Sequence, residues 1–189
     1  LDLYHALLTK NPIFMDRTRK IGEINAENAI RWGLTGPTLR GSGPAYDVRK
    51  TQPYSGYEQY DFDVPTGTHG DVYDRYLVRM EEMRQSLRIV QQALDKLPLG
   101  PVRTDDRRYV PPPRSELGTS MEAVIHHFKY WTEGFRLPAG AVYSPVESPK
   151  GELGVYLESD GGTHPHRVHW RTPSFIHLQA LPVLSRGHL

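Results

Sequence analysis

The sequence predicts an α+β protein with a helical bundle as its core and a small antiparallel β-sheet. Three observations predict this fold class. After Asp71, apolar residues recur at helical spacing over about seven turns. Between residues 142 and 171, shorter runs have the alternation that is typical of strands. The 17 glycines and 16 prolines among 189 residues require many turns and irregular connections between these elements.

The amino-terminal part predicts short helices followed by a long irregular segment. Residues 1–12 are typical of a helix that a proline ends. A second helix is expected over residues 26–32, with Asn25 as its N-cap and Gly33 as its end. Residues 33–70 have no helical or strand period, but their aromatic residues argue against disorder. We therefore expect an ordered and functional loop there.

A long helix is expected over residues 71–97, with Asp71 as its N-cap and Asp74 favoured by the helix dipole. Its apolar face consists of Leu77, Met80, Met83, Leu87, Val90, Leu94 and Leu97. The methionines fit a core or, as the weaker alternative, a binding surface, so we assign this helix to the core alone. Because so long a helix must bury this face against other elements, we expect an excised segment to fold poorly.

Residues 98–118 predict an extended linker rich in proline and arginine, with polyproline II structure around residues 111–113. A connection between helices is the simpler interpretation of this linker, and a ligand for an SH3-like partner is the alternative. Thr119 and Glu122 form a capping box, which predicts a helix over residues 119–134.

The β-rich part is expected over residues 142–171. Its strands are predicted over residues 142–146, 154–159 and 166–171. An Asp-Gly-Gly turn joins the last two strands as a hairpin, and a helical period resumes after Pro173. We expect residues 1–189 to form a single partial domain of a longer subunit, because the first residues already resemble the end of a helix.

Composition argues against several functional classes. The formal net charge of +1, with both signs mixed along the chain, gives no field that favours nucleic acid or an anionic membrane surface. No apolar run approaches the ~20 residues that cross a bilayer. Without cysteine, the segment has no disulfide and no thiolate metal ligand. His164, His166 and His169 cluster without a carboxylate at a second fixed spacing, so no metal site is expected.

Two short motifs place charged residues in a loop or next to a turn. The motif YDVRK places Asp47, Arg49 and Lys50 in the long loop, and an acid among basic neighbours suits a buried, proton-responsive cluster. A structural salt bridge that orders the loop explains the same residues equally well. The motif VESPKG places Glu147 and Lys150 at the mouth of a hairpin. That arrangement suits either a solvated turn or a site where charge meets a ligand.

Several blocks of the sequence resemble one known family, in the same order. They include GLTGPTLRGSGPAYDVRKTQPYSGYEQYDFDVPTGTHGDVYDRYLVRMEEMRQSLRIVQQAL, MEAVIHHFKYWTEGF, VESPKGELGVYLESDGG and RTPSFIHLQALPVLSRGH. These blocks are similar to the 49-kDa-type subunit of the proton-pumping NADH–quinone oxidoreductase, respiratory complex I. The family is related to the large subunit of nickel–iron hydrogenases, and the resemblance implies a fold like that of the hydrogenase protein. It covers essentially all 189 residues.

The resemblance implies a component of a redox enzyme that forms the quinone-reduction chamber beside the terminal iron–sulfur cluster of a neighbouring subunit. Quinone would be the substrate, and other subunits would bind NADH and flavin, so this segment would bind no cofactor. The implied partners are other complex I subunits, especially the cluster-bearing subunit and the 30-kDa-type subunit. The chain would lie peripherally on the cytoplasmic face of a bacterial inner membrane, or on the matrix side of the mitochondrial one.

The resemblance also assigns expected site residues. The hydrogenase relatives have a Glu-x-Pro-Arg-Gly-x-Leu-Gly element beside the buried cavity, which matches Glu147, Pro149, Lys150, Gly151, Leu153 and Gly154 here. At position 150, lysine offers a point charge where arginine offers a two-point fork. With Asp47, Arg49 and Lys50, Glu147 and Lys150 are the expected chamber or supporting residues. His177 stands where the family usually shows asparagine, and we assign it no function.

The resemblance places the family's quinone-contacting histidine and tyrosine on elements that precede this segment. No catalytic residue is therefore expected here, and the isolated segment is expected to be inactive. Two alternatives remain: the large subunit of a membrane-bound nickel–iron hydrogenase, with its metal-binding cysteines outside the segment, and a non-catalytic relative. The block YDFDVPTGTHGDVYDRYLVRMEEMRQS fits the quinone-reductase branch better.

Overall fold

The computed structural model describes residues 1–187, which form two compact units. Unit 1 consists of Leu1–Leu97, Ser144–Val155 and the described residues from Trp170 onward. Unit 2 consists of Pro98–Tyr143 and Tyr156–His169. Among the described residues, no helix combines the length and the apolar character that crossing a bilayer requires.

Unit 1 begins with short helical segments. They are α1 (Asp2–Tyr4), a π-helical turn (His5–Thr9), α2 (Pro12–Thr18) and α3 (Ala26–Arg31). A helical run from Asp2 to Thr9 ends before Asn11 and Pro12, as predicted, and Pro12 then begins α2, which the sequence did not predict. Asn11 caps α2 by accepting hydrogen bonds from the backbone N–H groups of Ile13 and Phe14. Asn25 caps α3 as predicted, with its Oδ1 accepting from the Asn28 N–H at 2.9 Å.

The segment over residues 33–70 is ordered, as expected from its aromatic residues. It also contains two short helices and a 3₁₀ turn that the sequence did not predict. They are α4 (Gly36–Arg40), α5 (Val48–Thr51) and the turn Tyr57–Gln59. The main apolar core of the described residues includes two residues of this segment, Leu34 and Leu39, together with Ile24, Ala29 and Ala180. The segment is therefore part of the core of unit 1 rather than a surface loop.

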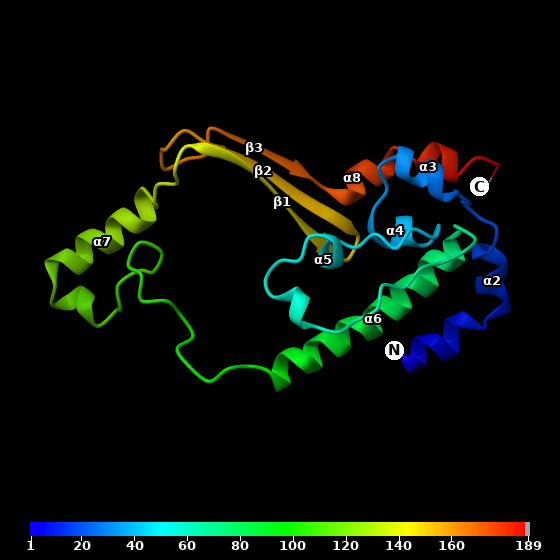
Figure 1. Ribbon diagram of the computed structural model, residues 1–189, viewed down its shortest axis with the longest axis horizontal. Helices are drawn as coiled ribbons and strands as arrows, with labels where there is room; N and C mark the ends of the chain where they lie inside the picture. Colours follow the sequence, from blue (N-terminus) through cyan, green and yellow to red (C-terminus); the bar gives the residue numbers. More distant parts are fainter. Residues whose placement is uncertain (188–189) are drawn as a thin grey trace. The chain divides into compact units, whose positions relative to one another are not determined.

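The long helix α6 (Val72–Asp95) confirms the predicted element. Asp71 is its N-cap and accepts a hydrogen bond from the Asp74 N–H at 2.8 Å. Helices α2 and α4 pack against α6 within unit 1 (Figure 1). The assignment of this helix to the core alone was wrong, because its predicted apolar face is exposed in its second half. The exposed fractions there rise from 42% at Met83 to 72% at Leu97.

Unit 2 contains the predicted linker and the second long helix, α7 (Met121–Thr132). The predicted capping box was wrong by one residue, because Ser120 and not Thr119 is the N-cap. The Ser120 Oγ accepts a hydrogen bond from the Ala123 N–H and donates one to Glu122. A 3₁₀ turn at Glu116–Gly118 precedes this cap.

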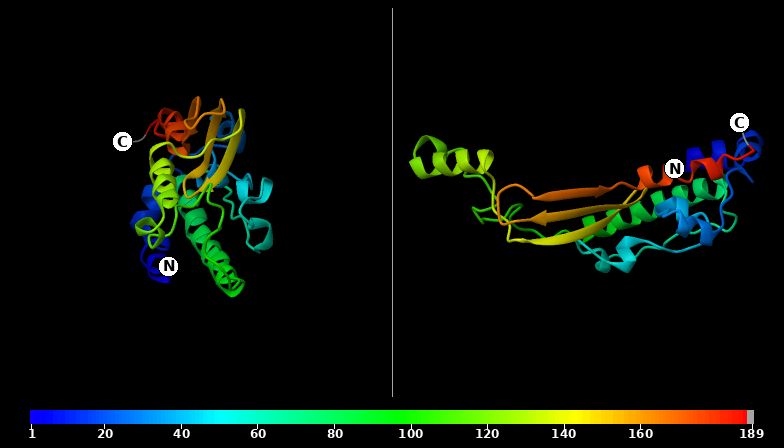
Figure 2. Two further views of the ribbon diagram at one scale, coloured as in Figure 1. Left: turned by 90° about the vertical axis from the view of Figure 1, so that its left-hand side faces the viewer. Right: turned by 90° about the horizontal axis from the view of Figure 1, so that it is seen from above.

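Three antiparallel strands form one sheet in the order β1-β2-β3 (Figures 1 and 2). They are β1 (Gly140–Ser148), β2 (Gly151–Ser159) and β3 (Arg167–Arg171). The first two are longer than predicted, and only two residues, Pro149 and Lys150, connect them. Two short helices follow the sheet, α8 (Pro173–Leu178) and α9 (Leu181–Leu184). Helices together with this sheet confirm the predicted α+β class.

Candidate functional site

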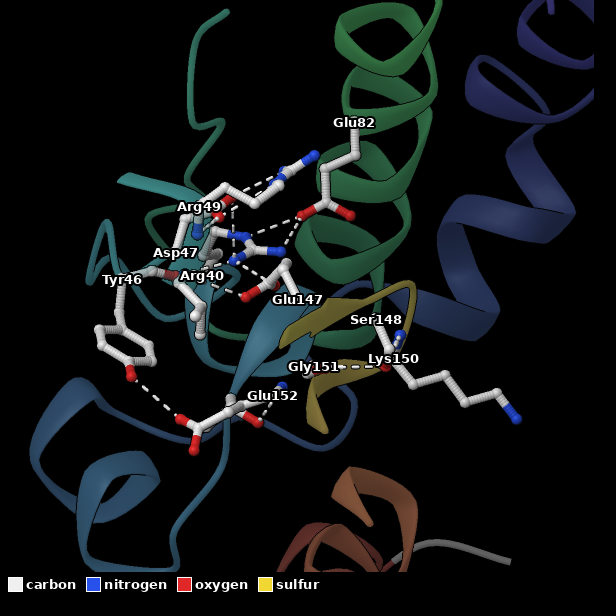
Figure 3. Close-up of polar contacts among 12 residues, drawn as sticks. Arg40, Tyr46, Asp47, Arg49, Glu82, Glu147, Ser148, Lys150, Gly151 and Glu152 are labelled. Carbon is white, nitrogen blue, oxygen red and sulfur yellow. Dashed lines mark hydrogen bonds and ion pairs between the residues drawn. The ribbon is translucent and has the colours of Figure 1, made fainter. Parts of the chain in front are cut away.

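Arg40, the last residue of α4, is the centre of a buried charge cluster in unit 1 (Figure 3). Its side chain is 2% exposed. The Arg40 Nε donates a hydrogen bond to Glu82 Oε1 at 2.8 Å, and Nη1 donates one to the Tyr46 carbonyl oxygen at 2.8 Å. Nη1 also lies 2.9 Å from Glu147 Oε1. A single guanidinium therefore joins α4 to α6 and to β1.

Asp47 and Arg49 form a second buried ion pair next to Arg40. The Asp47 side chain is 1% exposed, and its Oδ2 lies 3.8 Å from Arg40 Nη1. Arg49 donates from Nε to Oδ1 at 3.0 Å and from Nη2 to Oδ2 at 2.7 Å. Burial opposes the ionisation of Asp47, but these two bonds and the charge of Arg49 hold its pKa below the usual range. We call Arg40, Asp47, Arg49, Glu82 and Glu147 the Arg40 cluster.

The two glutamates of the Arg40 cluster differ from Asp47 in their electrostatics. Burial raises the pKa of Glu147, and the charge of Asp47 adds to this, although Arg40 opposes it. Burial also raises the pKa of Glu82 against the charge of Arg40. Asp47 is thus held as a carboxylate, whereas both glutamates take up a proton more readily than an exposed glutamate does.

Close backbone packing holds the β1–β2 hairpin against the start of α4. Gly36 and Gly151 have φ angles of +62° and +134°, and a Cβ built on Gly36 would lie 2.4 Å from Gly151 Cα. Only glycine allows both this conformation and this approach. The Glu152 N–H donates to Thr35 Oγ1 at 3.0 Å, which fixes the hairpin further. This packing places Glu147, near the end of β1, beside Arg40, at the end of α4.

The structure brings together three of the five predicted site residues and places the two lysines elsewhere. Asp47, Arg49 and Glu147 belong to the Arg40 cluster. Lys50 is exposed, and its Nζ lies 4.0 Å from the centre of the Phe62 ring. Lys150 is also exposed, and its side chain extends away from the Arg40 cluster (Figure 3).

Arg40 and Glu82 are site residues that the sequence analysis missed. Both looked like ordinary polar positions, Arg40 in a glycine-rich stretch and Glu82 on an amphipathic helix. A signal was present on α6, where Arg75, Arg79 and Glu82 recur at spacings of four and three and so share one face. Charged residues at that spacing within a helix assigned to a core predict a buried polar network.

The Arg40 cluster opens into a cleft of about 490 Å³ in unit 1. Glu82, Glu147 and the Arg79 side chain provide charged groups in its lining, and Tyr57, Met83 and Pro149 provide apolar surface. Convergent polar groups in a mostly apolar hollow are typical of sites for small organic molecules. The cleft therefore suits a molecule with an apolar body and a polar, hydrogen-bonding end.

A second hydrogen-bond network joins the start of α4 to β2 and to α8. The Thr35 N–H donates a hydrogen bond to His177 Nε2 at 3.1 Å. Burial lowers the pKa of His177 to about 4, and the positive charges of Arg171 and Arg79 contribute. The Tyr46 hydroxyl donates to Glu152 Oε2 at 2.9 Å. His177 is thus a neutral hydrogen-bond acceptor at neutral pH.

Within residues 1–187, the part of the chain that the structure describes, no arrangement of side chains supports metal binding. No group of three or more His, Asp or Glu side chains there is placed to hold one ion. In the Arg40 cluster the carboxylates instead surround guanidinium groups.

Residues 1–189 match the protein family described as "Respiratory-chain NADH dehydrogenase, 49 Kd subunit". The chain is 58% identical over 192 residues to a D-type NADH-quinone oxidoreductase subunit of Roseiflexus sp. (strain RS-1), covering all of this chain and 46% of the relative. It is 54% identical over 189 residues to the corresponding D-type NADH-quinone oxidoreductase subunit of Paramagnetospirillum magneticum, covering all of this chain and 48% of the relative.

The chain therefore spans about half the length of the curated relatives it matches. The match runs through both units and includes every member of the Arg40 cluster. It favours the quinone-reductase branch over the hydrogenase alternative. The chain belongs to the family of the 49-kDa subunit of respiratory-chain NADH dehydrogenase.

Proposed function

We propose that the protein containing this chain is a subunit of a proton-pumping NADH–quinone oxidoreductase, and that unit 1 forms part of its quinone-reduction chamber. The observation that carries this proposal is the cleft beside the Arg40 cluster, with an apolar wall and a charged lining, in a chain of this family. A quinone has an apolar ring and two carbonyl oxygens that accept hydrogen bonds, so its headgroup matches such a cleft.

Reduction of a quinone to a quinol takes up two electrons and two protons. The chain contains no cysteine, which is the usual ligand of iron–sulfur clusters, so the electrons would come from a cluster in a neighbouring subunit. NADH and flavin would likewise be bound by other subunits. The part of this chain would be to bind and orient the headgroup and to balance the charge that forms on it.

Arg79 is the cleft residue best suited to donate hydrogen bonds to a quinone carbonyl. Its Nη1 donates to the Arg75 carbonyl oxygen at 3.1 Å, and it forms no ion pair with a described residue. Arg79 lines the cleft and is exposed, so its remaining N–H groups are open to a polar ligand there. Arg40 and Arg49 are less available, because carboxylates already occupy most of their donors.

Assembly with other subunits, especially the cluster-bearing subunit and the 30-kDa-type subunit, is part of the proposal. Large apolar side chains are exposed on the second half of α6 and on α7, including Leu94 at 64% and Phe128 at 67%. Contiguous exposed apolar surface is typical of protein–protein contacts. The protein would be held peripherally at the membrane, on the cytoplasmic side in a bacterium, through these partners.

Variants of the cleft in the intact complex test this function. We expect Arg79→Ala to lower kcat/KM for quinone by roughly tenfold, which corresponds to about 1.4 kcal/mol of lost transition-state binding. Oxidation of NADH by an artificial acceptor that bypasses quinone should not change. The matched control is Arg84→Ala on the same helix, which we expect to leave both rates unchanged. Equal quinone kinetics in the Arg79 variant and the wild type would contradict the proposal.

A further inference from the structure

The charges of the Arg40 cluster do not balance. Three carboxylates face two guanidiniums, and all five side chains are at most 15% exposed. Arg49 is committed to Asp47 through two hydrogen bonds. Arg40 is therefore the cation that the cluster itself offers to both Glu82 and Glu147, and outside the cluster the charge of Arg79 adds to it at Glu82. An uncompensated buried carboxylate is costly, so this cluster favours the uptake of one proton.

Arg40 is shared unequally between the two glutamates. Glu82 Oε1 accepts a hydrogen bond from Arg40 Nε at 2.8 Å and lies 2.5 Å from Nη2. Glu147 Oε1 lies 2.9 Å from Nη1, which also donates one of its two N–H groups to the Tyr46 carbonyl oxygen. Glu82 therefore has a two-point contact with the cation and Glu147 has a single one. Of the three carboxylates, Glu147 is the least compensated.

The two oxygens of Glu147 have different surroundings. Oε2 accepts a hydrogen bond from the Val48 N–H at 3.2 Å. Oε1 is buried and accepts no well-aligned hydrogen bond from any described residue. Because Glu147 lines the cleft, its carboxyl group can exchange a proton with water there. Among the fully buried polar atoms of the described Arg40 cluster, Oε1 is the one without a hydrogen bond, so a proton there is the least opposed.

The other charged and titratable groups that face Glu147 come from three elements. Asp47 and Arg49 lie at α5, and Arg79 and Glu82 lie on α6. The Tyr54 hydroxyl, from the loop after α5, accepts a hydrogen bond from the Glu147 N–H at 3.0 Å. Of the cations in this set, only Arg79 is free of an ion pair with a described residue, and it is on the cleft side, where solvent screens its charge.

We propose that Glu147 is a proton-binding site that holds an exchangeable proton on Oε1 at neutral pH. Protonation forms an O–H bond between Oε1 and a proton that a cleft water delivers, and it leaves the Arg40 cluster electrically neutral. Release returns the proton to water in the cleft and restores the ion pair with Arg40. The site follows from the charge cluster alone and holds whether or not a quinone is reduced beside it.

Infrared spectroscopy of the intact complex tests this proposal, because a protonated carboxyl has a C=O stretching band that a carboxylate lacks. We expect such a band in the wild type at neutral pH, with a shift in D₂O as the proton exchanges. Glu147→Gln should abolish that band. Glu81→Gln, the matched control on α6 at a side chain that is 40% exposed, should leave it in place.

Three outcomes would overturn the proposal: no protonated carboxyl band in the wild type, a band that persists in Glu147→Gln, or a band that only Glu82→Gln abolishes. If Glu147→Gln does not assemble, Glu147→Asp keeps the carboxyl, and the band should then shift in frequency rather than remain unchanged. The readout is independent of turnover. Loss of quinone reduction in Glu147→Gln with an intact band would support the proposed function and refute the proton site.

Discussion

The Arg40 guanidinium forms the ion pair of the buried Glu82 carboxylate and also contacts Glu147, so its removal would leave a buried carboxylate without its ion-pair partner. We predict that Arg40→Ala lowers the stability of the protein by about 3–5 kcal/mol, the usual cost of an uncompensated buried charge. The measurement is the unfolding midpoint of the protein in the assembled complex. Arg88→Ala is the control, because Arg88 pairs with Asp61 and Asp63 at the surface. Exposed pairs of that kind contribute at most about 1 kcal/mol.

His177 makes the stability of unit 1 depend on pH in a defined direction. Its pKa is lowered to about 4 in the fold, from an ordinary value of 6.5, so the unfolded chain binds the proton more tightly. The stabilisation is therefore complete above about pH 6.5 and is lost as the pH falls toward 4.

Asparagine at position 177 should keep the acceptor for the Thr35 N–H and remove this titration. We predict that His177→Asn has a flatter dependence of the unfolding midpoint between pH 7 and 5 than the wild type. The exposed His169→Asn serves as the control and should retain the wild-type slope. Parallel curves for the His177 variant and the wild type would show that His177 does not titrate in this way.

Single residues of the site could be predicted only where a local pattern marked them. Asp47 and Arg49 lie two positions apart in an aromatic-rich loop, and Glu147 lies in a motif of its own. Arg40 and Glu82 are 42 positions apart and meet only because α4 packs on α6. Lys50 and Lys150 shared the predicted motifs, but their side chains are exposed. Charge in a motif does not specify the direction of a side chain.

At the scale of elements, the contact between the β1–β2 hairpin and α4 positions the site. We predict that Gly36→Ala costs about 1–3 kcal/mol, because alanine at φ +62° is strained and its Cβ would collide with Gly151. The Arg40–Glu147 contact should loosen as well, which quinone kinetics would report. Gly118→Ala has open space around its Cβ and should stay within about 0.5 kcal/mol of the wild type.

Elements long enough to show a repeating sequence pattern could be predicted, and short elements could not. The helix α6 has 24 residues and the strands alternate over several positions, so their patterns were clear. The helices α4 and α5 have five and four residues, too few for any period to appear. Asp47 caps α5 through a local bond from the Arg49 N–H, whereas Thr35 makes no side-chain capping bond and its Oγ1 accepts from the Glu152 N–H of the hairpin. The irregular segment was therefore predicted as ordered, but its internal helices were not.

At the scale of the whole molecule, the two compact units belong to a chain about half as long as its relatives. The expectation of a single partial domain stays a prediction, as does the expectation that the isolated segment folds poorly and is inactive. The exposed apolar half of α6 agrees with the physical reason for the second expectation, because the described residues leave much of that face in contact with solvent.

We propose that the cleft beside the Arg40 cluster receives a quinone headgroup in the intact complex. The most direct measurement is photo-crosslinking of a photoreactive quinone analogue to the intact complex, followed by identification of the labelled peptides. We predict labelling of the cleft wall at Tyr57, Met83 or Pro149 that an excess of unmodified quinone suppresses. Suppressible labelling confined to other subunits, or to α7 in unit 2, would contradict the claim.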